Sequence, residues 1–247
     1  LSVSFHRLWL RECRDICFLT HKKALRRGNQ IYNNHTEKRG SIMLSYNVLK
    51  SNGKPNWGKV GKALINQLEW TEHTDITAYA QLTYGADCLY VHLHADEKYI
   101  RAEGFGTLDE PYLDSCLEFF FSPSNGDSRY INIEMNPNCC IYFGIGTGND
   151  NLVRIILPQG ADFLNAECRK TPGSWDLYYE LPFSLIRLFF PNFAPEGSLR
   201  ANFYKCGDLT KQEHYLSWNR VECEKPDFHR PEYFGELIFS VEETERA

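Results

Sequence analysis

Two segments of the sequence alternate apolar side chains with polar and aromatic ones, in a pattern that suits the binding of a sugar. Residues 129–137 and 199–206 each place such side chains on one face of a predicted strand. The residues on these two faces are Tyr130, Asn132, Glu134 and Asn136, and Arg200, Asn202 and Tyr204. Aromatic rings, amides, carboxylates and guanidinium groups bind the C–H faces and paired hydroxyls of sugars. An ordinary solvated outer face carries the same residue types, so both alternatives stay open.

Trp218 and Arg101 complete the set of candidate sugar-binding residues. Trp218, in "YLSWNR", is the candidate for a ring that stacks on a sugar, although a core tryptophan gives the same pattern. Arg101, in "YIRA" just after the predicted strand 88–95, could instead form a surface ion pair with Glu97 or Glu103. Lys205 falls on the opposite face of its strand, so the predicted set does not include it.

The segment "HLHAD" contains residue types that bind zinc. His92, His94 and Asp96 match the start of an HxHxD pattern, which is typical of metallo-β-lactamase-like hydrolases. Glu97 stands where that pattern needs a further histidine. Both histidines also lie on the polar side of an alternating segment, which explains them without a metal ion. A metal-dependent hydrolase is therefore an alternative.

Carboxylates supply two further alternatives. Glu118 and Glu134 lie on successive predicted strands and could form the acid pair of a glycosidase, although their spacing does not fix the distance between them. Asp109, Glu110 and Asp114 form an acidic segment that could bind calcium, because this ion takes oxygen ligands. A solvated acidic loop explains the same three residues.

Alternating segments separated by turn residues predict a chain built mainly of β-strands. From residue 76 onward they lie at 88–95, 116–123, 129–137, 140–148, 174–183, 199–208, 214–221 and 233–241. Residues 183–190, between Pro182 and Pro191, predict a short helix, and a second short helix is allowed elsewhere. About eight to eleven strands favour an antiparallel two-sheet β-sandwich of the jelly-roll or immunoglobulin-like type. Trp57 and Trp70 are expected to pack against its edge.

Residues 1–42 differ in charge from the rest of the chain. They carry a net charge of +6, and residues 43–247 carry −11. Such a shift marks a tail, a targeting segment or a boundary, so we expect a basic extension at 1–42 and one domain at 43–247. The extension is either a basic arm or a segment ahead of a natural start at Met43. In the second case "KRGSIM" would be a back-translated bacterial ribosome-binding site.

Composition argues against several function classes. No run of eighteen apolar residues occurs, so we expect no membrane partner. The net charge of −5 gives no general attraction to nucleic acid. The nine cysteines are odd in number and include no CxxC pair, and no secretory signal peptide is recognised. These observations favour reduced thiols and a cytoplasmic location.

The order of several segments resembles a known family. Trp57 is followed by "LTYGADCLYVHLHADEKYIRA", "DSCLEFFFSP", "YINIEMNP", "WDLYYELPF", "LRANFYKCGD", "YLSWNRV" and "PDFHRPEYFGELIF". Over about residues 50–241 this ordered set resembles the family 9 carbohydrate-binding-module-like domains of the DOMON-like superfamily. The resemblance implies a β-sandwich with a sugar-binding face and, in some members, bound calcium. Arg101 resembles a loop arginine of this family, which implies that it could bind a pair of hydroxyls.

The sequence therefore predicts a non-catalytic protein that binds carbohydrate, as a small saccharide or a chain end. The alternatives are an enzyme of the hydrolase or glycosidase type and an interaction module without a small ligand. No cofactor is expected, and calcium is the one metal ion that the resemblance allows. The segment "PDFHRPEYFGELIF" is expected to lead into the last strand, with His229 and Arg230 pairing with backbone carbonyls or a carboxylate rather than with a sugar.

Overall fold

The structure, a computed structural model, describes residues 17–20, 43–72 and 74–243. Most of these residues are in strands or in the loops between them. The strands are β1 (Cys17–Thr20), β2 (Ser45–Lys50), β3 (Ala63–Ile65), β4 (Gln67–Leu68), β5 (Thr77–Tyr84), β6 (Cys88–Asp96), β7 (Cys116–Ser122), β8 (Tyr130–Met135), β9 (Ile141–Gly146), β10 (Val153–Ile156), β11 (Glu167–Thr171), β12 (Ser174–Pro182), β13 (Ser198–Cys206), β14 (Tyr215–Ser217) and β15 (Gly235–Glu243).

Helices are few and short in the described part of the chain. The α-helix α2 (Phe183–Phe189) follows Pro182, as the sequence predicts. The remaining helical turns are η2 (Trp57–Lys59), η3 (Pro111–Leu113), η4 (Asn149–Asn151), η5 (Gly160–Leu164) and η6 (Pro231–Tyr233). No helix of the described residues has the length and apolar character needed to cross a membrane.

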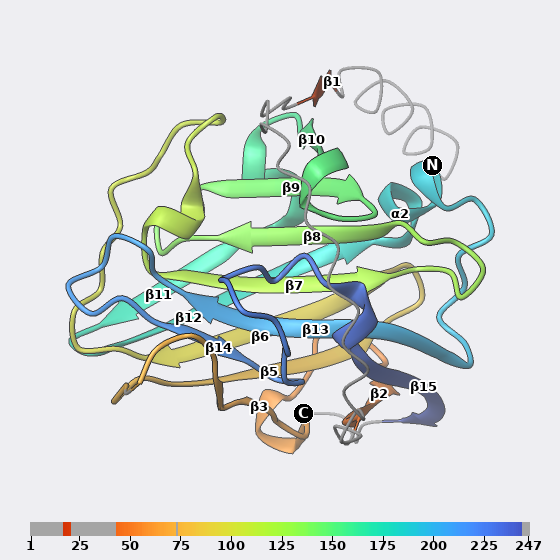
Figure 1. Cartoon of the computed structure of the whole chain (residues 1–247). Coiled ribbons are helices and arrows are strands. Elements are labelled where there is room, and N and C mark those ends of the chain that lie inside the picture. Colours follow the sequence, from red (N-terminus) through yellow and green to blue (C-terminus); the bar gives the residue numbers. More distant parts are fainter. Residues whose placement is uncertain (1–16, 21–42, 73, 244–247) are drawn as a thin grey trace, which may run out of the picture.

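The strands form one continuous, curled sheet of mixed type. Its order is β1-β10-β9-β8-β7-β13-β15-β2-β5-β6-β12-β11, with β3, β4 and β14 attached beside this path. Figure 1 shows β8, β7 and β13 in front of β12, β6 and β5. The predicted all-β class is confirmed, but two separate antiparallel sheets are not found. The last strand, β15, enters between β13 and β2 and runs parallel to β2, which is itself parallel to β5.

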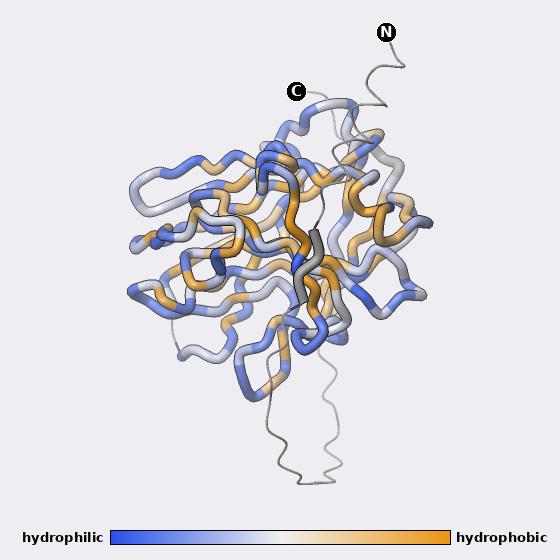
Figure 2. Tube along the Cα trace, turned by 90° about the horizontal axis from the view of Figure 1, so that it is seen from above, coloured by the Kyte–Doolittle hydropathy of each residue, from blue (hydrophilic) through white to orange (hydrophobic). Residues whose placement is uncertain are grey.

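The main core lies between the two halves of the curled sheet. β12 buries every second side chain, with Trp175, Leu177, Tyr179 and Leu181 facing inward. Phe119 and other apolar residues of β7, β8 and β13 face them from the opposite half. Figure 2 shows hydrophobic and hydrophilic positions alternating along the strands. This period of two is the one expected for strands with one face in the core.

The outer faces of β7, β8 and β13 are buried as well. All side chains of β7 and β8 are buried, and those of β13 are buried from Ala201 onward. A second apolar cluster covers this face, with Phe120, Tyr130, Tyr204 and Phe228 among its members. In Figure 1 the chain between β14 and β15 crosses in front of these strands. The ordinary solvated face that the sequence left open is therefore excluded here.

Part of the predicted N-terminal extension is in a strand. Residues 17–20 form β1, which pairs antiparallel with β10 at one end of the sheet. These four residues of the predicted basic extension therefore belong to the sheet. Residues 1–16 and 21–42, with "KRGSIM" up to Ile42, lie outside the described residues.

Candidate functional site

A cavity of about 340 Å³ opens over the outer face of β7, β8 and β13. Its lining contains aromatic residues, carboxylates and the segment Pro226–His229. The aromatic residues are Trp70, Tyr112, Tyr142, Tyr215 and Phe228, and the carboxylates are Glu110, Glu118, Glu134, Asp150, Asp208 and Asp227. The described lining residues include no lysine or arginine. The cavity is therefore both aromatic and strongly acidic.

Two carboxylates lie side by side at the centre of this face. Glu118 on β7 and Glu134 on β8 are direct cross-strand partners, and they are 2% and 4% exposed. Directly opposed residues have Cβ atoms about 4.5–5.5 Å apart. The Cys206 thiol donates to Glu118 Oε1 at 2.9 Å, and Asn132 Nδ2 donates to Glu134 Oε1 at 2.6 Å. Glu134 Oε2 is buried and has no hydrogen-bond partner among the described residues.

Burial changes the protonation of this pair. It raises the pKa of Glu118 to about 7, an effect that the Cys206 hydrogen bond opposes. Burial also raises the pKa of Glu134 well above its ordinary value, and the neighbouring charge of Glu118 adds to this shift. Two carboxylates this close cannot both ionise easily, so at neutral pH the pair holds at least one proton. The pair can then both donate and accept hydrogen bonds, as sugar hydroxyls do.

The aromatic residues stand on both sides of the carboxylate pair. Tyr142 is on β9 and Tyr215 is on β14, and the sheet order places β8, β7 and β13 between them. Trp70 follows β4, which pairs with β14, and its ring lies 5.7 Å from that of Tyr215 and 5.2 Å from that of Phe228. A ligand above the carboxylates would therefore lie between aromatic rings.

Trp70 is held in an unusual conformation. Its φ of 49° lies in the left-handed region, which bulky residues rarely adopt. The indole Nε1 donates to the Cys223 carbonyl at 2.8 Å, which fixes the ring while leaving it partly exposed. Strained residues of this kind cluster at binding sites, where the surrounding structure maintains them. Trp70 follows β4, beside the main path of the sheet, and it also lines the cavity, which the sequence did not predict.

The segment before the last strand forms part of the cavity wall. Phe228 stacks on Tyr204 with ring centroids 4.1 Å apart, and its carbonyl accepts from the Tyr204 hydroxyl. His229 Nδ1 lies 2.8 Å from the Tyr130 hydroxyl, and burial lowers the pKa of this histidine to about 4. His229 is therefore neutral at pH 7. Its position at the cavity departs from the purely structural role expected from the sequence.

Arg230 behaves as the sequence predicts. It does not line the cavity, and its guanidinium lies 3.1 Å from Glu232 and 3.7 Å from Asp227. The pairing with carboxylates before the last strand is thus confirmed for this residue.

Four of the predicted sugar-binding residues belong to this site or support it directly. Glu134 lines the cavity. Asn132, Tyr130 and Tyr204 lie beneath the lining and hold Glu134, His229 and Phe228 through the hydrogen bonds described above. These three residues are fully buried, so they position the lining rather than form it.

The other predicted residues lie elsewhere. Trp218 is 4% exposed and packs against Phe203 in the main core, so its prediction as an exposed stacking platform is wrong. Asn202 is fully buried and donates to the Asn219 carbonyl. Its neighbour on β13, Arg200, donates to the Phe234 carbonyl.

Arg101 and Asn136 converge on Asp114, away from the cavity lining. The Arg101 guanidinium contacts one carboxylate oxygen of Asp114 at 3.0 Å, and Asn136 Nδ2 donates to the other at 2.8 Å. Arg101 also pairs with Glu103, one of the two carboxylates expected as its partners in a surface ion pair. Neither residue is among those that line the cavity.

The acidic segment does not fit a calcium site. Asp109 accepts from the backbone amides of Phe105 and Gly106, and Asp114 accepts from those of Glu103 and Gly104. These carboxylates thus face hydrogen-bond donors, whereas a calcium ion needs converging oxygen ligands. The third acid, Glu110, lines the cavity instead.

The structure thus defines a β-sheet binding module, with a cavity walled by aromatic rings over a pair of buried carboxylates. The model of carbohydrate-binding family 9 matches residues 55–239, so the chain belongs to this family. Membership confirms the predicted family and the non-catalytic carbohydrate-binding function. The relationship to the DOMON-like superfamily and the cytoplasmic location remain predictions. No curated protein sequence matches the chain.

Solved structures share the fold. One is a candidate carbohydrate-binding protein from Bacteroides uniformis, with a TM-score of 0.68 and 24% identity over 81% of this chain and 100% of that one. Two others are family 9 modules from Caldicellulosiruptor kristjanssonii, each 12% identical. The complex with cellotriose has a TM-score of 0.56 over 80% of this chain and 94% of that one. The complex with glucose has a TM-score of 0.58 over 83% and 99%.

Proposed function

We propose that the cavity over β7, β8 and β13 binds a monosaccharide, a disaccharide or the end of a saccharide chain, without chemical change to it. The observation that carries this proposal is the position of Glu118 and Glu134 between aromatic rings. Rings contact the apolar faces of a sugar, and the carboxyl groups between them bind its hydroxyls. The glucose and cellotriose complexes of similar folds support the same ligand class.

The volume of the cavity limits the size of the ligand. Ligand pockets span about 300–1,000 Å³, and this one, at about 340 Å³, is near the lower end of that range. It suits one or two sugar rings better than a long stretch of polysaccharide. A longer chain would enter only by its end, with the remaining rings outside in solvent.

The carboxylate pair suits binding better than glycoside hydrolysis. A retaining glycosidase needs one ionised carboxylate as its nucleophile and one protonated acid. Here the pKa values of both Glu118 and Glu134 are raised, and neither group has an environment that keeps it ionised at low pH. The pair is therefore a hydrogen-bonding platform.

Calorimetric titration tests the proposal. Glucose, cellobiose and cellotriose, together with ligands chosen from a glycan array, are titrated into the wild-type chain and into Trp70→Ala. Loss of the ring should weaken binding about tenfold, which corresponds to about 1.4 kcal/mol. The matched control is Trp57→Ala, which removes another partly exposed tryptophan that does not line the cavity.

The two variants separate the proposed site from other faces. Trp57→Ala should bind the same sugars with unchanged affinity, and circular dichroism should show that both variants fold. The proposal fails if no saccharide binds the wild-type chain, or if Trp57→Ala loses binding while Trp70→Ala retains it.

A further inference from the structure

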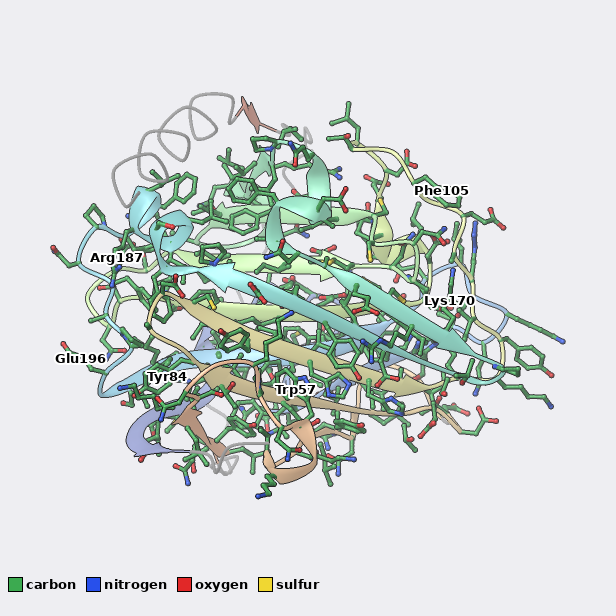
Figure 3. All side chains as sticks on the ribbon, turned by 180° about the vertical axis from the view of Figure 1, so that it is seen from behind. Trp57, Tyr84, Phe105, Lys170, Arg187 and Glu196 are labelled. Atoms are coloured by element: carbon green, nitrogen blue, oxygen red, sulfur yellow. The ribbon has the colours of Figure 1, made fainter. Side chains whose placement is uncertain are left out.

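A second group of polar side chains lies on the outer face of the opposite half of the sheet. His92 and His94 on β6 meet Asp176 on β12, and Asp176 Oδ1 lies 2.7 Å from His92 Nε2 and 2.8 Å from His94 Nδ1. Each of the three residues offers one atom that could bind a metal ion, and these three atoms lie within 4.8 Å of one another. Figure 3 views the molecule from behind and labels Trp57, whose ring lies 5.3 Å from that of His92.

This group is separate from the sugar cavity. The neighbouring residues of β6, Val91 and Leu93, point into the main core, so His92 and His94 point away from it. The cavity lies over the outer face of β7 and β8, on the other side of the same core. None of the three residues lines the cavity, so the proposed sugar site does not account for them.

Gln81 on β5 fixes the proton of His92. Its amide nitrogen donates to the carbonyl oxygens of Trp57 and Val60, at 2.8 Å and 2.6 Å. The amide oxygen must then be the atom that faces His92 Nδ1, at 2.8 Å. Because this oxygen can only accept, Nδ1 carries a hydrogen.

The other ring nitrogen of His92 is then left facing a carboxylate. A neutral ring with its hydrogen on Nδ1 has a lone pair on Nε2, and that lone pair points at an oxygen that only accepts. Either a second proton or a metal cation must stand between the two atoms.

We propose that His92, His94 and Asp176 bind a divalent transition-metal ion, for which Zn²⁺ is the best fit. Two imidazoles and one carboxylate are a usual zinc ligand set, and water can take the fourth position. Bonds of about 2.0–2.1 Å in a tetrahedral site place ligand atoms about 3.3 Å apart, so the two distances between Asp176 Oδ1 and the histidine nitrogens would lengthen by about half an ångström. The HxHxD pattern in the sequence suggested Asp96 as the third ligand. In the proposed site this ligand is instead Asp176, which belongs to another strand.

Groups outside the ligand set hold the imidazoles in position. His92 stacks on Tyr178 at 4.3 Å, and His94 stacks on Tyr79 at 4.7 Å. Asp96 Oδ1 lies 3.3 Å from His94 Nε2, on the side away from Asp176. Outer partners of this kind orient histidine ligands and set which nitrogen meets the metal, as Gln81 does for His92.

Titration of ZnCl₂ into the chelator-treated, dialysed full chain tests the site. Calorimetry should show one site per chain, and Co²⁺ should give the visible absorption of a tetrahedral complex. Asp176→Asn keeps the shape of the side chain and should weaken Zn²⁺ binding at least tenfold. Zn²⁺ should also raise the unfolding temperature of the wild-type chain and not that of this variant.

Two controls locate the metal. Glu167→Gln changes an exposed carboxylate on the adjacent strand β11 and should leave the affinity within twofold of wild type. Cys206→Ser disrupts the other potential ligand group, Cys116, Glu118 and Cys206, and should also leave zinc binding intact.

Three results would overturn the proposal. They are the absence of a one-to-one zinc complex, wild-type affinity in Asp176→Asn, and loss of binding in Cys206→Ser. Nitrogen NMR of His92 at pH 7 tests independently whether a proton or a metal ion lies between His92 and Asp176. Two protonated ring nitrogens that zinc does not change would show that a proton, not a metal ion, lies between His92 and Asp176.

Discussion

Replacing Glu118 by glutamine should stabilise the protein at pH 8 and make its stability less dependent on pH. Glu118 is fully buried beside Glu134, and its pKa rises from an ordinary 4.5 to about 7 in the folded protein. Glutamine has nearly the same shape, keeps an oxygen to accept from Cys206 and carries no charge at any pH. The substitution therefore removes the cost of ionising this buried group.

The sign and the size of the effect follow from the pKa shift. Between about pH 4.5 and about pH 7 the folded chain binds the Glu118 proton more tightly than the unfolded chain does. The free energy of unfolding therefore falls as pH rises through this window, and the loss is complete above it. At 1.36 kcal/mol per unit the shift corresponds to about 3 kcal/mol. Glu118→Gln should not suffer this loss.

Urea unfolding at half-unit steps from pH 4 to pH 8.5 measures the difference. In the ligand-free protein, wild type and Glu118→Gln should diverge progressively above about pH 5 and reach a difference of about 3 kcal/mol at pH 8. In thermal unfolding, about 2–4 °C per kcal/mol gives a higher midpoint by about 6–12 °C at pH 8. Glu196→Gln changes an exposed glutamate and serves as the control, which should follow wild type throughout.

Parallel curves for wild type and Glu118→Gln across the whole range would refute this reasoning. Such a result would mean that the folded protein stabilises the ionised carboxylate as well as water does. The cavity would then be better solvated than its burial indicates.

Two further substitutions test the roles of neighbouring residues. Trp218→Ala should lower the free energy of unfolding by about 3–5 kcal/mol, because it empties a core position beside Phe203, while the folded protein keeps its affinity for sugar. Denaturant unfolding and calorimetry measure the two effects, and an unchanged stability would contradict the core position. Gly144→Ala should weaken sugar binding, because a methyl group at this position of β9 would collide with the Asn132 amide that donates to Glu134. Sugar titration checks this, with Gly126→Ala, at a site where a methyl group meets nothing, as the control.

The strands were predictable where one face is buried and the other is exposed. β12 alternates strictly between buried and partly exposed side chains, and in both β6 and β12 the inward residues are those that the sequence pattern selects. The pattern could not show that the outer faces of β7, β8 and β13 are covered. The cover comes largely from residues 218–234, which have no periodic pattern of their own. The parallel pairing of β15 with β2 could not be predicted from the sequence either, because it joins distant parts of the chain.

Only those residues of the candidate site that belong to the strands under the cavity were predictable from the sequence. Asn132, Glu134 and Tyr204 were found because they share the strand face that the cavity occupies. Trp70 and Phe228 come from loops, where sequence spacing does not determine position. Trp218 was misplaced because an inward and an outward position in a short strand have the same sequence pattern.

The insertion of β15 between β13 and β2 has a consequence for the synthesis of the protein. Until this strand emerges from the ribosome, β13 and β2 have no strand between them, and β5 is the only neighbour of β2 in the described sheet order. The cavity wall at Pro226–His229 lies just before the same strand, so it is completed in the same late step. Non-local pairing of this kind is slow to form and leaves sheet edges open to aggregation. A nascent chain that lacks β15 would therefore be a client for chaperones, and ligand capture would begin only after this strand has been synthesised.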